Sequence, residues 1–202
     1  MTGDATARAL NLPVLVGSVR EGRRSIHVAR HVGDALARRE GIEAGLIDLS
    51  EFDLPILIER PQQADRPPPG YEPFQSRLRA ADGLVIVSPE YKGGIPGVLK
   101  NALDHLEPGV FRRRPIGIVT VSAGGLGGVG CLAQLRQVCL SMGGLPIPVA
   151  LPVSEVEALF DERGDAVDDR LARRLGPFLD ELIWYVGATA RQRRLDAASG
   201  GA

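Results

Sequence analysis

The sequence predicts an α/β fold, with one sheet of five parallel strands and helices on both of its faces. Segments typical of strands alternate with segments of helical periodicity five times, which favours a parallel sheet joined by right-handed crossovers. Residues 83–88 are almost entirely apolar, as expected for a central strand buried on both faces. Unusual loops follow the first, third and fourth strands, which are neighbours in the strand order 2-1-3-4-5. These loops should therefore meet at the sheet edge where doubly wound proteins bind ligands.

The boundaries of each element follow from local patterns. The strands are expected at residues 12–16, 44–48, 83–88, 115–121 and 145–149. The helices are expected at residues 25–39, 71–81, 96–106, from the loop at 122–128 to about 141, and 168–188. Gly176 and Pro177 predict a break in the last helix. Residues 59–70 carry four prolines and should form a surface excursion, because the strand at 83–88 needs the first strand as its neighbour.

The chain is expected to hold a single domain. Residues 1–11 have the composition of a flexible leader, and residues 12–189 contain all the predicted strands and helices. Residues 190–202 are small and polar, which predicts a disordered tail.

Composition excludes several classes of function. The formal net charge of this 202-residue chain is -1, so no global charge favours nucleic acid. No apolar run is long enough for a transmembrane helix, and the first nine residues lack the apolar core of a signal peptide. Cys131 and Cys139 are eight residues apart in one predicted helix, too far apart to form a disulfide with each other. Free thiols are typical of a reducing compartment, so the cytoplasm is the expected location. No histidine pairs with a cysteine at metal-ligand spacing. His27 and His31 are four residues apart, a helical spacing that can bind metal, but no third ligand accompanies them, so we expect no metal site.

The loop at residues 17–25, G-S-V-R-E-G-R-R-S, connects the first strand to the first helix. Free backbone N–H groups and the positive end of a helix meet there with serine hydroxyls and arginine side chains, a combination suited to a phosphate group. Neither common phosphate motif matches, because Val19 replaces the second glycine of G-x-G-x-x-G and Arg23-Arg24-Ser25 replace the Lys-Ser/Thr of the triphosphate loop. An ordinary turn with a solvated basic edge is the alternative.

The loops at residues 89–94 and 122–128 suggest a flat ligand attached to that phosphate. Their glycines allow close approach of the backbone and leave N–H donors exposed, and Tyr91 offers an aromatic surface. Two alternatives remain at this point. Tyr91 could be a core tyrosine, and Gly127-Gly128 could serve tight packing of a helix against the sheet.

Three motifs in these loops resemble the NADPH-dependent FMN reductase family. They are Gly17-Ser18-x-Arg20 with Ser25; Pro89-Glu90-Tyr91 followed by Pro96-Gly97-x-Leu99-Lys100-Asn101-Ala102-x-Asp104; and Ser122-x-Gly124-x-x-Gly127-Gly128. The resemblance spans about residues 12–149 and implies a flavodoxin-like three-layer sandwich that binds FMN. The middle motif is the most specific of the three.

The resemblance also implies roles for individual residues. It implies that Ser18, Arg20 and Ser25 hold the FMN phosphate, with Ile26 and His27 contributing through their backbone. Arg23 or Arg24 could reach either the FMN phosphate or the 2′-phosphate of NADPH. Residues along the isoalloxazine ring would be Pro89, Glu90, Tyr91, Lys92 and Gly93, with Ser122, Gly124 and Gly125 at its far edge. Lys92 departs from the family, which often has asparagine there, and its side chain would lie near the ring or extend into solvent.

The sequence therefore predicts an FMN-dependent oxidoreductase without a catalytic side chain, because the cofactor carries the hydride chemistry. NADPH or NADH would reduce the flavin, and an acceptor would then take the same place in a ping-pong mechanism. The acceptor could be free flavin, a quinone, an azo dye or a metal oxyanion. The helix at 96–106 has more apolar residues than one buried stripe needs, which predicts a subunit contact, and the resemblance implies a homodimer or homotetramer. The alternatives are an electron-carrier flavoprotein, which is usually more acidic, and a phosphate-ligand-binding protein without a redox role.

Overall fold

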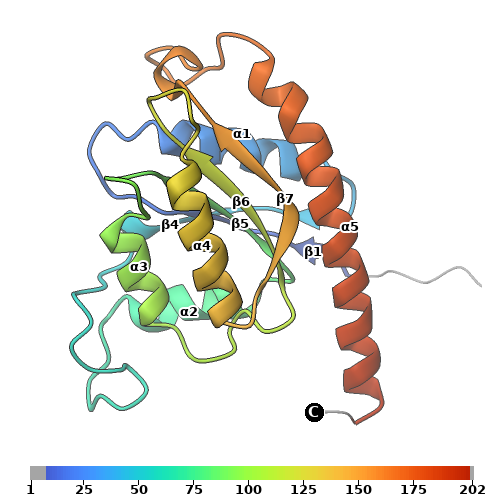
Figure 1. The fold of residues 1–202 in the computed structure, drawn as a ribbon. Coiled ribbons are helices and arrows are strands. Elements are labelled where there is room, and N and C mark those ends of the chain that lie inside the picture. The colour runs from blue at the N-terminus through green and yellow to red at the C-terminus, as the bar shows by residue number, and fades with distance from the viewer. Residues whose placement is uncertain (1–7, 201–202) are drawn as a thin grey trace, which may run out of the picture.

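The computed structural model describes residues 8–200 and contains a five-stranded parallel sheet at its centre (Figure 1). The strands are β2 (Val14–Val16), β4 (Leu46–Asp48), β5 (Leu84–Pro89), β6 (Pro115–Val121) and β7 (Leu145–Val153). They lie in the order β4-β2-β5-β6-β7, and all neighbours are parallel. Numbered along the chain, these strands have the order 2-1-3-4-5, as the sequence predicted.

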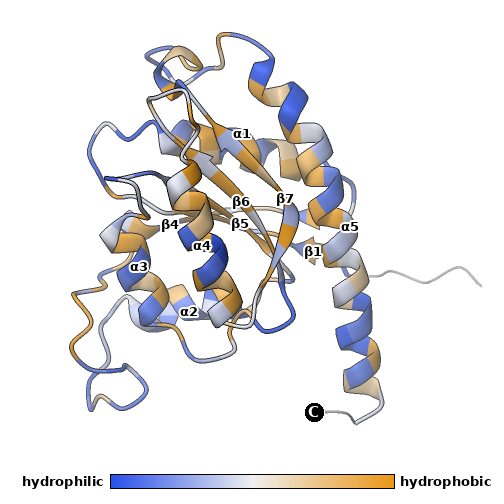
Figure 2. Ribbon diagram, viewed as in Figure 1, coloured by the Kyte–Doolittle hydropathy of each residue, from blue (hydrophilic) through white to orange (hydrophobic). Residues whose placement is uncertain are grey.

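Helices cover both faces of this sheet. They are α1 (Ser25–Ala37), α2 (Tyr71–Arg79), α3 (Gly97–Asp104), α4 (Val129–Ser141) and α5 (Arg170–Ala198), with short 3-10 turns at Leu49–Glu51 and Val156–Ala158. One core cluster joins α1 and α5 to the sheet, and the other joins α2, α3 and α4 to the opposite face. Apolar sides of the helices face the sheet and polar sides face outward (Figure 2). The fold is thus the predicted three-layer α/β sandwich.

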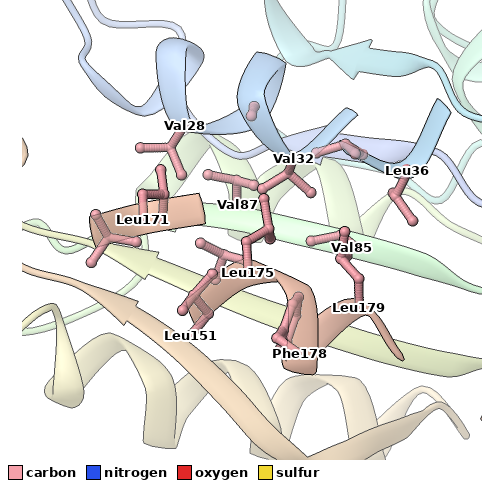
Figure 3. Close-up of a cluster of buried hydrophobic side chains, with 14 of the residues drawn as sticks. Val28, Val32, Leu36, Val85, Val87, Leu151, Leu171, Leu175, Phe178 and Leu179 are labelled. Carbon is pink, nitrogen blue, oxygen red and sulfur yellow. The ribbon is translucent and has the colours of Figure 1, made fainter. Parts of the chain in front are cut away.

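The packing of α5 on the sheet depends on a glycine. Gly117 lies in β6, and a Cβ atom there would come within 2.8 Å of Phe178 Cζ and 3.0 Å of a Leu182 methyl group. Phe178 and Leu179 pack beside Val85 and Val87 between α1, α5 and the sheet (Figure 3). The small residue therefore lets the helix approach the sheet closely.

The N-terminal segment is more ordered than the predicted leader. Residues 1–7 lie outside the described part of the chain, but β1 (Leu10–Asn11) pairs in parallel with β3 (Ile42–Glu43). The Asn11 backbone N–H donates to Asp82 Oδ2 at 3.0 Å, and the Arg8 guanidinium donates to the same oxygen at 2.9 Å. A buried carboxylate from a distant part of the chain thus fixes this segment.

β7 continues four residues beyond its predicted end at Val149, to Val153. The strand contains prolines at 146, 148 and 152, which would be unsuited to a central strand. β7 is an edge strand, however, and a proline is tolerated on an edge because one side of the strand forms no ladder. The extension carries the chain to the sheet edge where the three loops meet.

α5 is longer than predicted at its C-terminal end and is not interrupted. Pro177 is exposed, while Leu175 and Phe178 on either side of it are buried in one core, so continuous packing outweighs the lost backbone hydrogen bond. The helix runs to Ala198, so residues 190–198 are not the predicted disordered tail; residues 201–202 lie outside the described chain. Arg193 holds this end by donating to the Asp82 carbonyl at 3.1 Å and to its carboxylate at 3.3 Å.

Two further observations concern surfaces. Within residues 8–200, no helix combines the length and apolarity needed to span a bilayer. On α3, Leu99, Ala102 and Leu103 are buried within the chain itself. The apolar character of α3 is explained by the chain's own core, so it is not an argument for a subunit interface.

Candidate active site

The loop between β2 and α1 places one buried hydroxyl group without a partner at the N-terminus of a helix. Ser25 is the first residue of α1 and is 2% exposed, and its Oγ has no hydrogen-bond partner. Buried polar atoms nearly always have a partner, so a bare hydroxyl beside the free N–H groups of a first helical turn indicates a site for an anion. Arg20 is exposed beside it, and its guanidinium forms no ion pair in the described chain.

Arg23, in contrast, is already engaged. Its guanidinium forms an ion pair with Asp48, the last residue of β4, and also lies 3.4 Å from Ser50 Oγ. The Asp48 carboxylate accepts two more hydrogen bonds, from the Ser50 N–H at 3.0 Å and from its hydroxyl at 2.9 Å. Arg23 therefore ties the loop at residues 17–25 to the neighbouring strand. Sequence reasoning missed Asp48, although an acid ending the strand beside β2 was a usable signal.

Ser18 is completely buried and positions Tyr91. Its Oγ lies 2.6 Å from the Tyr91 hydroxyl, and it also accepts a weak hydrogen bond from the Arg20 N–H at 3.4 Å. These contacts hold Tyr91 in place, and the role of Ser18 towards a phosphate stays a prediction. Tyr91 is 36% exposed, so it is not a core tyrosine.

The segment after β5 forms a tight turn. The backbones of Tyr91 and Gly94 exchange hydrogen bonds of 2.9 and 3.1 Å, and Lys92 and Gly93 between them have φ angles of +52° and +80°. Two consecutive positive φ angles define a type I′ turn, which favours Asn-Gly at its centre. The asparagine that the resemblance led us to expect at position 92 would suit this turn.

Glu90 lines the cleft and also forms a hydrogen bond to the first turn of α4. Its carboxylate accepts a 3.0 Å hydrogen bond from the Cys131 N–H in the first turn of α4. This contact satisfies a free donor and complements the positive end of α4. Burial and the charge of Glu90 raise the pKa of the Cys131 thiol, while a hydrogen bond from Ser88 lowers it, and burial is the largest of these effects.

The loop after β6 is tied to the segment after β7. Ser122 Oγ donates to the Gly124 carbonyl at 2.8 Å, which also accepts from the Glu155 N–H at 3.1 Å. A Cβ atom at Gly127, whose φ is +64°, would lie 2.7 Å from Pro152 Cβ, so this glycine is needed for close packing. At Gly124 and Gly125 an added Cβ would meet nothing within 4 Å, so these two glycines leave open space at the rim.

A cleft at the carboxyl edge of the sheet brings the three loops together. Predicted residues that line it are Arg20, Arg23, Ser25, Pro89, Glu90, Tyr91 and Ser122. Arg24, Val121, Ala123, Val156 and Glu157 also line it. The last two come from the segment after β7, which the sequence reasoning missed because it ended that strand too early. Ser18 lies beneath Tyr91, and Lys92, Gly93, Gly124 and Gly125 do not line the cleft itself.

A second groove adjoins this cleft on the outer side of the same loop. It is lined by Val19, Arg20, Glu21, Gly22, Arg23, Arg24, Ile26, His27, Arg30 and Glu162. The backbone N–H of His27 donates to the Arg24 carbonyl at 3.1 Å, so this donor is used within the helix turn in this structure. Partial burial lowers the pKa of His27, the charges of Arg24 and Arg30 lower it further, and Asp161 opposes them.

Comparison with known proteins identifies the family. The family model described as NADPH-dependent FMN reductase matches residues 10–158. The chain belongs to this family.

Relatives support the assignment over nearly the whole chain. The chain is 30% identical over 186 residues to a quinone reductase of Pseudomonas putida, covering 89% of this chain and 96% of the relative. It is 27% identical over 177 residues to an FMN-dependent NADPH-azoreductase of Staphylococcus aureus strain USA300, covering 86% and 93%. The structure of the flavoenzyme NAD(P)H:(acceptor) oxidoreductase FerB from Paracoccus denitrificans superimposes with a TM-score of 0.74 at 24% identity, covering 90% and 99%. This FMN reductase family member thus has a fold found among flavoenzymes.

Proposed function

We propose that the cleft holds FMN and that the protein is an FMN-dependent NAD(P)H reductase of small acceptors. The observation that carries this proposal is the buried, unpartnered Ser25 hydroxyl at the N-terminus of α1, with Arg20 beside it. A phosphate dianion would give this hydroxyl its missing acceptor and would be stabilised by the helix terminus and the guanidinium.

The other lining residues fit the flavin part of FMN. Tyr91, held by Ser18, offers an aromatic surface, and the rim beside Ser122 is open at Gly124 and Gly125. We assign the ring to this side of the cleft, with Pro89, Glu90 and Tyr91 along it. Lys92 and Gly93 shape the turn that presents Tyr91. A flat ring needs this combination of aromatic surface and small residues, which a site for free phosphate does not.

FMN held in this cleft would supply the redox chemistry, namely acceptance of a hydride from NAD(P)H and electron transfer to a second substrate. The chain's own residues bind and orient. Arg20 and Ser25 fix the phosphate, the Ser18–Tyr91 hydrogen bond fixes the aromatic side chain, and the Glu90 contact with α4 fixes the strand-to-turn junction.

The acceptor is proposed to be a small planar molecule, such as a quinone, an azo compound or free flavin. Relatives over most of the chain are named as a quinone reductase and an azoreductase, and the glycine-lined rim leaves space for a flat molecule. We place the enzyme in the cytoplasm, in keeping with two free, buried cysteines.

A homo-oligomer is also proposed. Ile56 and Ile58, two residues apart in the segment before α2, are 77% and 96% exposed, which is unusual for such large apolar side chains and supports a protein contact at this segment. Light scattering at micromolar concentration should give a multiple of 21.5 kDa. A stable monomer at that concentration would remove this part of the proposal.

The function is tested by the visible spectrum of the FMN-loaded protein under anaerobic conditions. Addition of NADPH or NADH should bleach the flavin absorbance, and a quinone should restore it. A protein that binds FMN but is not reduced by either nucleotide at millimolar concentration would be a carrier or binding protein, not a reductase.

A further inference from the structure

The turn that presents Tyr91 projects from the edge of the sheet. Tyr91, Lys92 and Gly93 are all exposed, so burial does not hold this turn in place. The hydrogen bond to Ser18 fixes the far end of the Tyr91 side chain, but not the backbone that carries it. An exposed turn opens locally at a low cost in free energy, so the backbone needs an anchor of its own.

One side of α4 supplies this anchor before, within and after the turn. Before the turn, the Glu90 carboxylate accepts a hydrogen bond from the first turn of α4. Within it, the Gly93 carbonyl oxygen lies so close to Gly130 that a Cβ atom added to Gly130 would come within 2.8 Å of it. After it, the Ile95 N–H donates to Gln134 Oε1 at 3.2 Å. Gly130 and Gln134 are four residues apart, so they lie on the same side of the helix.

The Gln134 amide fills the space beside Gly94, where another residue would have a side chain. A Cβ atom added to Gly94 would lie 2.7 Å from Gln134 Oε1 and 3.2 Å from Nε2. Gly93 has a φ of +80°, which favours glycine, but Gly94 has no positive φ, so its backbone conformation accepts other residues. The obstructing atoms are the end of a flexible side chain. A side chain at position 94 would therefore displace the amide and break its hydrogen bond to Ile95.

We propose that Gln134 is a positioning residue of the flavin site, because it fixes the backbone of the turn that carries Tyr91. Gln134 does not line the cleft, so its effect on a ligand passes through the turn. Tyr91 does line the cleft, on the side that we assign to the ring rather than to the phosphate. Loss of the Gln134 contact should therefore act on the ring part of the flavin. The inference rests on the proposed function, because it needs a flavin in the cleft.

The test is titration of flavin-free protein with FMN and with riboflavin. Gln134→Ala should weaken the binding of both flavins by the same factor of about three to ten, the range expected for one neutral hydrogen bond, because the phosphate is not involved. Ser25→Ala, in contrast, should weaken FMN alone. Gln134→Glu keeps an acceptor oxygen for the Ile95 N–H and should hold both affinities within about twofold of the unaltered protein. Gln137→Ala is the matched control, because Gln137 is an exposed glutamine further along the same helix, and it should change neither affinity.

A second variant tests the coupling between positions 94 and 134. Gly94→Ala should displace the Gln134 amide and weaken both flavins about as much as Gln134→Ala does. In protein that already carries Gln134→Ala the obstructing amide is gone, so Gly94→Ala should have little further effect. Such non-additive losses are expected for two residues in direct contact, whereas two independent losses of stability would add.

Several outcomes would overturn the inference. Unchanged flavin affinities in the Gln134→Ala protein would refute it, and so would a loss confined to FMN, which would place the effect at the phosphate. Additive losses in the double variant, or a Gln134→Glu protein as weak as Gln134→Ala, would also refute it. A protein that takes up neither flavin refutes the proposed function, and the inference with it. One that takes up both flavins but does not respond to changes at positions 94 and 134 refutes only the inference.

Discussion

Ser25→Ala should have opposite effects on the empty and the FMN-bound protein. In the structure the Ser25 hydroxyl is buried and lacks a partner, a situation that costs about 1–3 kcal/mol. Removing it should raise the free energy of unfolding of FMN-free protein by about 1 kcal/mol, which corresponds to a rise in Tm of about 2–4 °C for a chain of this size. In the complex the same hydroxyl donates to phosphate, so its loss should weaken FMN binding by roughly 10-fold or more.

The assay is thermal unfolding of the FMN-free protein, together with titration by FMN and by riboflavin. Riboflavin lacks the phosphate and should bind the variant and the parent protein alike. Ser18→Ala is the matched comparison, because the Ser18 hydroxyl is bonded to Tyr91 in the structure, and its removal should lower the stability of FMN-free protein. If Ser25→Ala destabilises the FMN-free protein, or weakens FMN and riboflavin equally, the phosphate assignment is wrong.

Three other predictions concern stability. Lys92→Asn should stabilise the protein by about 1 kcal/mol in chemical unfolding, because asparagine tolerates the left-handed backbone (φ +52°) that strains lysine; a loss of stability would contradict the type I′ turn. Gly117→Ala should destabilise the protein by about 1–3 kcal/mol, because the added methyl group clashes with Phe178. The control is Gly187→Ala in α5, where an added Cβ meets nothing, and it should be neutral or stabilising. A Gly117→Ala variant of unchanged stability would mean that α5 can move away from the sheet. Burial raises the pKa of the Cys139 thiol to about 12, so the folded state holds the thiol proton more tightly than the unfolded state does. The stability that this protonated thiol contributes is present below pH 9 and is lost as the pH rises from 9 towards 12. The free energy of unfolding measured across that pH range tests this.

Strands and helices could be predicted where the local order of apolar and polar residues shows which side of the element is buried. The apolar run at 83–88 became the fully buried strand β5, and the helical stripe of Val28, Val32 and Leu36 became the buried side of α1. Such patterns are local consequences of which face is buried, so a single sequence is enough to read them.

Elements fixed by distant partners were not predictable. The pairing of β1 with β3 and the last turns of α5 depend on contacts of Asn11 and Arg193 with Asp82, 71 and 111 residues away in sequence. The polar composition of residues 190–198 carries no sign of that anchor. The last four residues of β7 also depend on the whole sheet. Proline is compatible with a strand mainly when the strand lies at an edge, and β7 is an edge strand.

The same limit applies to the candidate site. The motifs predicted that the three loops meet at one rim of the sheet, but the partners of each side chain decide which residues of the motifs face a ligand. Glu90 contacts α4, and Ser18 holds Tyr91. Neither arrangement could be inferred from the spacing of the motif, because each depends on how two loops meet.

The three arginines of the phosphate loop show how the fold divides one charge cluster among different tasks. Val16 pairs with Asp48 across β2 and β4, so the carboxylate lies next to the point where β2 enters the loop. It engages Arg23 there, which removes one positive charge from the anion site and ties the loop to the sheet. Arg20 then lines the cleft with Ser25 and forms no ion pair within residues 8–200, while Arg24, which lines both the cleft and the outer groove, donates to the Asp161 carbonyl. Asp48 therefore engages one arginine of this loop in the fold and leaves Arg20 and Arg24 for the phosphate that we propose the cleft holds.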